Sequence, residues 1–234
     1  MIDIHSHLLF GVDDGPKTLE ESVLMLKEAA EQGVSTIILT PHYRHGMFPY
    51  KKDTIMEHYR ELLPYAKGEG ISLYLGCEYH VNSRIIEALS SKRVLTLADS
   101  AYVLTEYEYE TEYEYIVNMS RELISRGYVP VIAHVERYKC LLKEAENIEE
   151  LRRLGALIQI NAPAILGKEG WAQKRFCRKL LDMGEVDFIG SDSHGIKNRP
   201  NRMKECRDYL MKKYEKSYVD RILRQNPGKI LDEG

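Results

Sequence analysis

The sequence predicts an α/β fold in which about seven strand–helix units in series form a barrel. Short apolar runs rich in β-branched residues alternate along the chain with segments whose apolar residues recur at helical spacing. Such alternation is typical of a mainly parallel sheet. The chain has 234 residues, a length at which α/β barrels commonly form one domain. The order of the strands cannot be deduced from the sequence, so a doubly wound open sheet is the alternative architecture.

The first half of the chain contains four predicted strands. Residues 1–5 form a short apolar strand, and residues 18–32 form a helix that ends at Gly33. The β-branched run over residues 34–40 predicts a buried strand. A helix is predicted over residues 52–67, and Pro64 should kink or shorten it. The remaining elements of this half are a strand over 71–77, a short helix over 82–89 and a strand over 101–106.

The second half continues the alternation without interruption. A helix is predicted over residues 112–126, with Thr111 and Glu114 as a capping box at its start. The later elements are strands over 128–134, 156–161 and 186–191, and helices over 148–154, 168–183, 202–214 and 218–224. Because no linker rich in Ser, Gly or Pro divides the series, we expect a single domain over residues 1–234.

The composition excludes several classes of protein. Lys plus Arg is 33 and Asp plus Glu is 36, giving a net charge of −3, whereas nucleic-acid binding needs concentrated positive charge. No run approaches the ~18 apolar residues of a membrane span, and the first residues do not resemble a signal peptide. The four cysteines are scattered, with no C-x-x-C pair, as in reduced cytosolic proteins. We therefore expect a cytoplasmic protein that neither inserts into a membrane nor binds nucleic acid.

Residues 102–115 have an unusual composition, because glutamate and tyrosine alternate from Glu106 onward. One interpretation is an exposed strand end followed by the acidic start of a helix. The other is an acidic, aromatic rim beside a pocket.

Histidine or acidic residues stand at the ends of six of the seven predicted strands. His5 and His7 form an H-x-H pair, whose side chains lie on one face of a strand and can share a metal ion. Active sites of α/β folds are built at the carboxyl ends of the strands. The other candidates are Asp13 and Asp14 in the first loop, and His42, Glu78, Glu106, His134, Asp192 and His194 near later strand ends.

The chemistry of these residues indicates divalent metal ions. Imidazole and carboxylate ligands without thiolate suit Mn²⁺, Zn²⁺ or Fe. Five histidines and four carboxylates exceed the needs of one ion and imply two or three. Of the remaining histidines, His58 is predicted on a helix surface, and His45 and His80 are predicted at the rim of the site or behind the ligands.

Several of these motifs together resemble one known family. The motifs are DIHSH from Asp3, the DDGP loop, Thr40-Pro-His42, Gly76-Cys-Glu78, HVERY from His134 and Ser191-Asp-Ser-His194. They look like the PHP (polymerase and histidinol phosphatase) superfamily, and within it the manganese-dependent tyrosine-protein phosphatases linked to capsule and exopolysaccharide synthesis in Gram-positive bacteria. The resemblance covers essentially the whole chain. It implies a distorted (β/α)₇ barrel with a trinuclear metal centre at the carboxyl ends of the strands.

The resemblance also implies a role for each candidate. His5, His7, Glu78 and Asp192 would hold one ion, and Glu78 would bridge to a second ion held by Glu106 and His134. Asp14, His42 and His194 would hold the third ion, and Asp13 is the less favoured member of its pair. Arg137 and Arg199 would bind the substrate phosphate, with Arg44 as a weaker candidate. The family has an aromatic residue and then proline after the fourth-strand glutamate. Here Tyr107 is followed by Glu108, which leaves Glu106 and Glu108 as alternatives.

The expected activity is hydrolysis of phosphotyrosine by a metal-activated hydroxide without a covalent intermediate. The resemblance implies that the partner is the tail of a bacterial tyrosine kinase that controls polysaccharide export. A cysteine phosphatase is disfavoured, because no cysteine begins a C-x₅-R motif. The alternatives are a small-molecule PHP phosphatase, such as one for histidinol phosphate, or a non-catalytic metal-dependent module that binds phosphopeptides. The native metal and the oligomeric state are left open.

Overall fold

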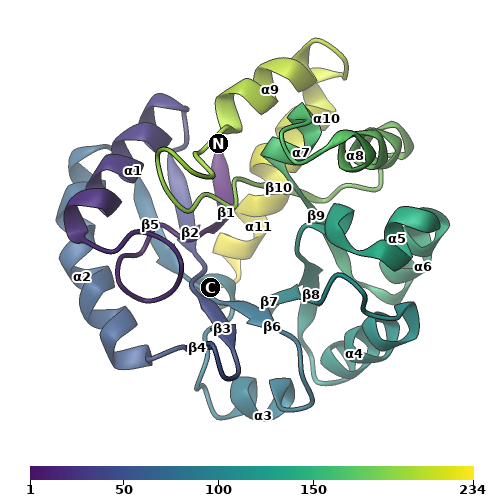
Figure 1. Cartoon of the computed structure of the whole chain (residues 1–234), viewed down its shortest axis with the longest axis horizontal. Coiled ribbons are helices and arrows are strands. Elements are labelled where there is room, and N and C mark those ends of the chain that lie inside the picture. Colours follow the sequence, from purple (N-terminus) through teal and green to yellow (C-terminus); the bar gives the residue numbers. More distant parts are fainter.

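The computed structural model describes residues 1–234 and confirms the predicted α/β barrel (Figure 1). Its strands form two hydrogen-bonded sheets, ordered β1-β2-β5 and β10-β9-β8-β7-β6-β3-β4. All neighbours are parallel except β3 and β4. The strands are β1 (Ile2–Ser6), β2 (Thr36–Leu39), β3 (His42–Arg44), β4 (Phe48–Pro49), β5 (Ser72–Leu75), β6 (Glu78–His80), β7 (Tyr102–Glu106), β8 (Val129–Ile132), β9 (Leu157–Asn161) and β10 (Phe188–Gly190).

The second and third strand positions of the barrel are each broken in two. β2 and β3 are separated by Thr40 and Pro41, and β5 and β6 by Gly76 and Cys77, so each chain segment passes from the first sheet to the second. A Cβ atom on Gly76 would lie 2.9 Å from Cδ2 of Leu97, which explains why this break needs glycine. After the breaks, β3 and β6 pair with His42 opposite Glu78. The breaks therefore place two candidate ligands side by side.

The barrel closes between its first and last strands. An isolated parallel bridge joins Ser6 to Ser193, and the backbone N–H of His7 donates to the carbonyl of Ser193 at 3.0 Å. The N–H of Asp192 donates to the carbonyl of His5 at 2.9 Å. A Cβ atom on Gly190 would approach Cβ of His5 to 2.7 Å, so a glycine at the end of β10 lets the two strands meet. This seam brings the first and last candidate ligands together.

Helices surround the barrel, and α11 lies behind it in the view of Figure 1. A core of 54 buried residues packs largely between helices and strands, and a smaller cluster of 10 includes residues from strands around the ring. Ile230 of α11 and Leu97 belong to that smaller cluster, which fills the barrel interior below the site. The α-helices are α1 (Leu19–Glu31), α2 (Lys52–Gly68), α3 (Ile85–Ser90), α4 (Tyr113–Ser125), α5 (Lys139–Lys143), α6 (Glu146–Leu154), α7 (Ala162–Leu166), α8 (Trp171–Met183), α9 (Met203–Met211), α10 (Lys216–Asp220) and α11 (Asn226–Asp232). Shorter helical turns are η1 (Leu97–Asp99), η2 (Val135–Arg137) and the π-helical η3 (Arg221–Gln225).

Two local predictions were wrong. Of the two effects predicted for Pro64, a kink or a shortened helix, the shortening is wrong, because α2 continues to Gly68. Both Pro64 and Arg60, whose carbonyl the missing N–H would have bonded, are on the exposed side of α2, where water can replace that bond. The capping box is also absent: Glu112 is the N-cap residue of α4 and makes no side-chain cap, since Thr111 closes a turn on the carbonyl of Glu108.

The short elements β3, β4, β6, α5, α7 and α11 were not predicted, because each carries too few residues for a periodic pattern. His58 was predicted at the surface, but its ring stacks on Phe10 and its Nδ1 lies 2.8 Å from the Phe10 carbonyl. None of the helices has the length and apolar character needed to cross a membrane.

Candidate metal centre

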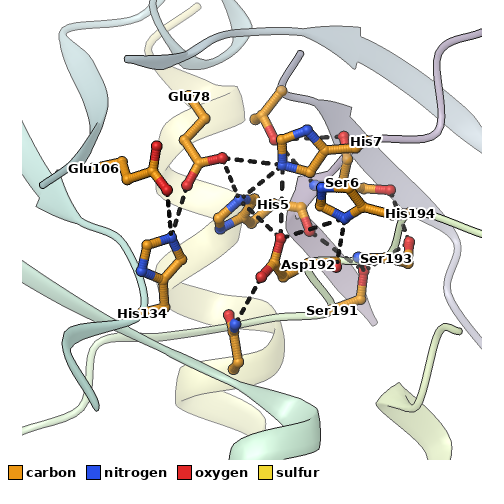
Figure 2. Close-up of polar contacts among 12 residues, drawn as sticks. His5, Ser6, His7, Glu78, Glu106, His134, Ser191, Asp192, Ser193 and His194 are labelled. Carbon is orange, nitrogen blue, oxygen red and sulfur yellow. Dashed lines mark hydrogen bonds and ion pairs between the residues drawn. The ribbon is translucent and has the colours of Figure 1, made fainter. Parts of the chain in front are cut away.

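All nine predicted ligands converge at the carboxyl end of the barrel. Figure 2 shows His5, His7, Glu78, Glu106, His134, Asp192 and His194 among them. β1 supplies His5 and continues into His7, and the loop after it supplies Asp14. The remaining candidates stand on β3, β6 and β7 or directly after β8 and β10: His42, Glu78, Glu106, His134, Asp192 and His194. One patch of the barrel mouth therefore gathers side chains from positions 5 to 194 of the chain.

Glu78 lies at the centre of this cluster. Its Oε2 is 3.2 Å from Nε2 of His5, 3.0 Å from Nε2 of His7 and 3.0 Å from Nδ1 of His42. Its Oε1 is 2.8 Å from Nε2 of His134. Burial of the Glu78 side chain opposes its ionisation, but the surrounding histidines, His5 above all, outweigh burial and hold the pKa of Glu78 well below its usual range. One buried carboxylate thus contacts four imidazoles.

Asp14 marks the open side of the cluster. Its Oδ1 lies 3.2 Å from Nε2 of His194 and 3.5 Å from Nε2 of His42. The ring of His194 also stacks on His7 at a centroid distance of 4.0 Å. The side chain of Asp14 is 47% exposed, whereas His7 and His194 are buried. A substrate can therefore reach the cluster from the side of Asp14.

Asp192 connects the cluster to the two predicted arginines. Its Oδ1 faces His5 Nε2 at 3.5 Å, whereas its Oδ2 is 2.8 Å from Nη2 of Arg137 and 2.6 Å from Nη2 of Arg199. His134, Asp192 and Arg199 all have positive φ, at 34°, 50° and 55°. Such backbone conformations cost about 1–3 kcal/mol each and cluster at functional sites. The fold therefore holds the arginines beside the candidate ligands despite an energetic cost.

The donor set fits metal ions. Four buried donor atoms have no hydrogen-bond partner: Glu78 Oε2, Glu106 Oε2, His42 Nδ1 and His194 Nε2. An unsatisfied buried polar atom costs about 1–3 kcal/mol, and coordination to a cation would satisfy it. Burial, and then repulsion by Glu78, raise the pKa of Glu106 to about 9 in the absence of an ion.

The donor atoms form four groups in which all atoms lie within 4.8 Å of one another. These groups are His5-His7-Glu78, His7-Asp14-His42-His194, His42-Glu78-Glu106 and His5-His134-Asp192. The first and second match the expected first and third ions. The expected second group, Glu78-Glu106-His134, is present as pairs, with His134 Nε2 at 2.8 Å from Glu78 and 3.7 Å from Glu106. The assignment of each ligand to an ion stays a prediction.

Three further side chains orient the histidines, and sequence reasoning missed two of them. Asp13 Oδ2 lies 2.8 Å from Nδ1 of His7, so the less favoured aspartate of the pair holds a ligand ring. Gln159 Oε1 lies 3.1 Å from Nδ1 of His5, and the Tyr138 hydroxyl lies 3.3 Å from Nδ1 of His134. A partner on Nδ1 leaves Nε2 free to face a metal. Gln159 was not predicted because an amide side chain is not a usual metal ligand and gives no signal at the end of a strand.

The structure distinguishes between Glu106 and Glu108 as the candidate metal ligand at the end of the fourth strand. Glu106 lies 3.8 Å from His42 and 3.7 Å from His134, within the cluster. Glu108 is 60% exposed and pairs with Arg44 and with His80 Nε2. Geometry therefore favours Glu106 as the candidate ligand and places Arg44 at the rim. His45 is exposed in the loop between β3 and β4 and belongs to none of the four donor groups.

Known proteins share both the sequence and the fold. Residues 1–232 match the protein family described as "Capsular polysaccharide synthesis, CpsB/CapC". The chain is 36% identical to the tyrosine-protein phosphatase CpsB of Streptococcus pneumoniae, covering 99% of this chain and 98% of that protein. It is 30% identical to the tyrosine-protein phosphatase YwqE of Bacillus subtilis, over 99% of this chain and 91% of that one.

A solved structure from a study of YwqE and CpsB, described there as metal-dependent tyrosine phosphatases, matches with a TM-score of 0.93 and 28% identity. The match covers 100% of this chain and 95% of the solved one. A phosphotriesterase homology protein from Escherichia coli matches with a TM-score of 0.60 at 14% identity, which shows the fold alone. With 36% identity to one member over nearly its full length, the chain belongs to the CpsB/CapC family.

Proposed function

We propose that this chain is a metal-dependent protein-tyrosine phosphatase, formed by a single catalytic domain over residues 1–234. The observation that carries the proposal is the convergence of nine His, Asp and Glu ligands beside two arginines at the mouth of the barrel. The family relatives named tyrosine-protein phosphatases support the same activity. The proposed substrate is a phosphotyrosine-bearing bacterial tyrosine kinase of capsule or exopolysaccharide synthesis. Four unpaired cysteines are consistent with a reaction in the reducing cytoplasm.

The proposed cofactors are two or three divalent ions, with Mn²⁺ preferred and Zn²⁺ or Fe as alternatives. The residues that would hold them are His5, His7, Asp14, His42, Glu78, Glu106, His134, Asp192 and His194. When bound, such ions lower the pKa of water and polarise phosphoryl oxygens.

The two arginines have a separate task. Each guanidinium presents a fork of N–H donors that matches phosphate oxygens, and neither can be a metal ligand because it has no acceptor. Asp192 Oδ2 pairs with Nη2 of each arginine. Glu169 also accepts from Arg137, through Nη2 at 2.9 Å and Nε at 3.3 Å, which leaves Nη1 of Arg137 and the other N–H groups of Arg199 to bind phosphate. Phosphoryl transfer depends mainly on positioning and on neutralising charge, which this pair would provide.

Replacing Arg137 or Arg199 by alanine should lower kcat by about 10²–10³, the usual cost of one lost oxyanion-stabilising donor. Lysine at either position should restore activity only partly, because it lacks the planar fork. Steady-state kinetics and metal content should be measured for each variant. Arg153→Ala is the matched control, since Arg153 is 77% exposed and pairs only with Glu149. If an alanine variant had normal kinetics, the arginine it replaces would not bind the substrate phosphate. If a variant lost its bound metal, the arginine would have a structural role instead.

The function itself is tested with the Mn²⁺-loaded protein on three substrates. We expect faster hydrolysis of a phosphotyrosyl peptide than of a phosphoseryl peptide or histidinol phosphate, measured as kcat/KM from phosphate release. A preference for histidinol phosphate would identify a small-molecule phosphatase instead. Tight binding of the phosphotyrosyl peptide without turnover would identify a non-catalytic binding module.

A further inference from the structure

A cavity of about 530 Å³ opens beside the candidate metal centre. It lies between the loop that follows β1 and the loop that follows β10, and the start of α1 forms part of its wall. At its inner end it is lined by Asp14, His194 and Arg199. A phosphate held at the cluster would therefore have the rest of its substrate in or over this cavity. The volume is within the range of about 300–1,000 Å³ typical of ligand pockets.

The outer part of the cavity combines apolar and basic groups. Two exposed aliphatic side chains line it, Leu24 on α1 at 47% exposure and Ile196 in the second loop at 44%. Lys17 and Lys197 also line it, and Glu21 is the one acidic residue there besides Asp14. The ammonium of Lys17 is fixed at the rim by a 2.7 Å bond to the carbonyl of Asp13.

The opposite side of the barrel mouth is acidic. β7 occupies the fourth of seven strand positions, three away from both β1 and β10. The segment after β7 carries Glu112 and Glu114, which form no ion pair, and Glu108 and Glu110, which pair with Arg44 and Lys139. It also presents the exposed rings of Tyr109 and Tyr115. Of the two interpretations of this segment, its position favours an acidic, aromatic rim. The mouth is therefore basic on the side of the cavity and acidic across from it.

We propose that this cavity binds the peptide segment that carries the phosphotyrosine and that it selects acidic residues beside the phosphotyrosine. Leu24 and Ile196 provide apolar contact to the segment, and Lys17 and Lys197 attract its carboxylates. The acidic rim after β7 repels the same carboxylates and keeps the peptide on the cavity side. This inference rests on the proposed phosphatase function and adds the substrate sequence that the site prefers.

The test compares two phosphotyrosyl peptides of equal length, one with Asp and Glu beside the phosphotyrosine and one with Asn and Gln. The wild-type protein should have the higher kcat/KM on the acidic peptide, and the preference should shrink as salt screens the charges. Lys197→Glu should lower the acidic-to-neutral ratio by about three- to tenfold, as expected for reversing one exposed charge. Lys197 is exposed and forms no ion pair, so the variant should fold; Lys197→Gln should give a smaller change in the same direction.

Lys229→Glu is the matched control, because Lys229 is exposed on α11 at the far end of the barrel. A ratio that falls equally in both variants, or in neither, would overturn the proposed subsite, and so would a wild-type preference for the neutral peptide. If the wild type hydrolysed p-nitrophenyl phosphate but neither peptide, the proposed function would fail together with this inference. Hydrolysis of both peptides with an unchanged ratio would remove the inference alone.

Discussion

Replacing Glu78 by glutamine should lower kcat by about 10³ or more, since even one lost stabilising donor costs about 10²–10³. Glutamine keeps the volume of the side chain but removes the negative charge at the centre of the cluster. Glu78 is buried and lies within 3.2 Å of His5, His7, His42 and His134. We therefore expect the variant to lose bound metal as well as activity, measured by metal analysis and steady-state kinetics.

Glu108→Gln is the control for this experiment, because it makes the same chemical change at the rim. Glu108 is 60% exposed and contacts Arg44 and His80 rather than the cluster. This variant should retain most of the activity and all of the metal. Near-normal turnover of Glu78→Gln with a full metal content would show that Glu78 is not a bridging ligand.

Chelation should abolish hydrolysis and lower thermal stability, and added Mn²⁺ should restore both. Ions that bind only the folded state stabilise it by about 4 kcal/mol at a thousand times their Kd. Without the ions, burial of Glu106 and then repulsion by Glu78 raise the pKa of Glu106 to about 9. The measurements are phosphate release and melting temperature across a titration of chelator and then of Mn²⁺.

Alkylation of thiols supplies the contrasting treatment and should leave activity largely intact. Cys77, Cys177 and Cys206 are buried, and burial raises the pKa of each thiol. Cys140 is half-buried and lies outside the cluster. Activity that survived thorough chelation, or that alkylation destroyed, would contradict a metal-dependent mechanism.

The positions of the strands and most candidate ligands could be predicted because each signal is local. An apolar run of β-branched residues identifies a strand, and His, Asp or Glu at its end identifies the edge where the site forms. Glu106 and Asp192 were identified as candidate ligands in this way. The proposed preference for Mn²⁺ and the proposed phosphate role of the arginines rest on the family resemblance rather than on the residues themselves.

The features that were not predicted depend on contacts between distant parts of the chain. The break after β5 could not be predicted, because it depends on the close contact of Gly76 with Leu97, 21 positions later in the chain. Gln159 orients His5 across 154 positions, and an isolated glutamine gives no signal of that role. Pro64 illustrates a different kind of error. Proline predicts an early end of the helix, but α2 continues past Pro64 because that side of the helix is exposed to solvent.

The seam between β1 and β10 has a consequence for biosynthesis. The hydroxyls of Ser6 and Ser193 meet across 187 positions, so His5 and His7 leave the ribosome long before Asp192 and His194 are added. At about 5–20 residues per second, roughly 10–40 seconds separate the two events. Contacts of such long range also form slowly, because the chain between them must first be ordered. The nascent chain therefore lacks the complete set of candidate ligands until translation has passed residue 194, and full metal loading follows closure of the barrel.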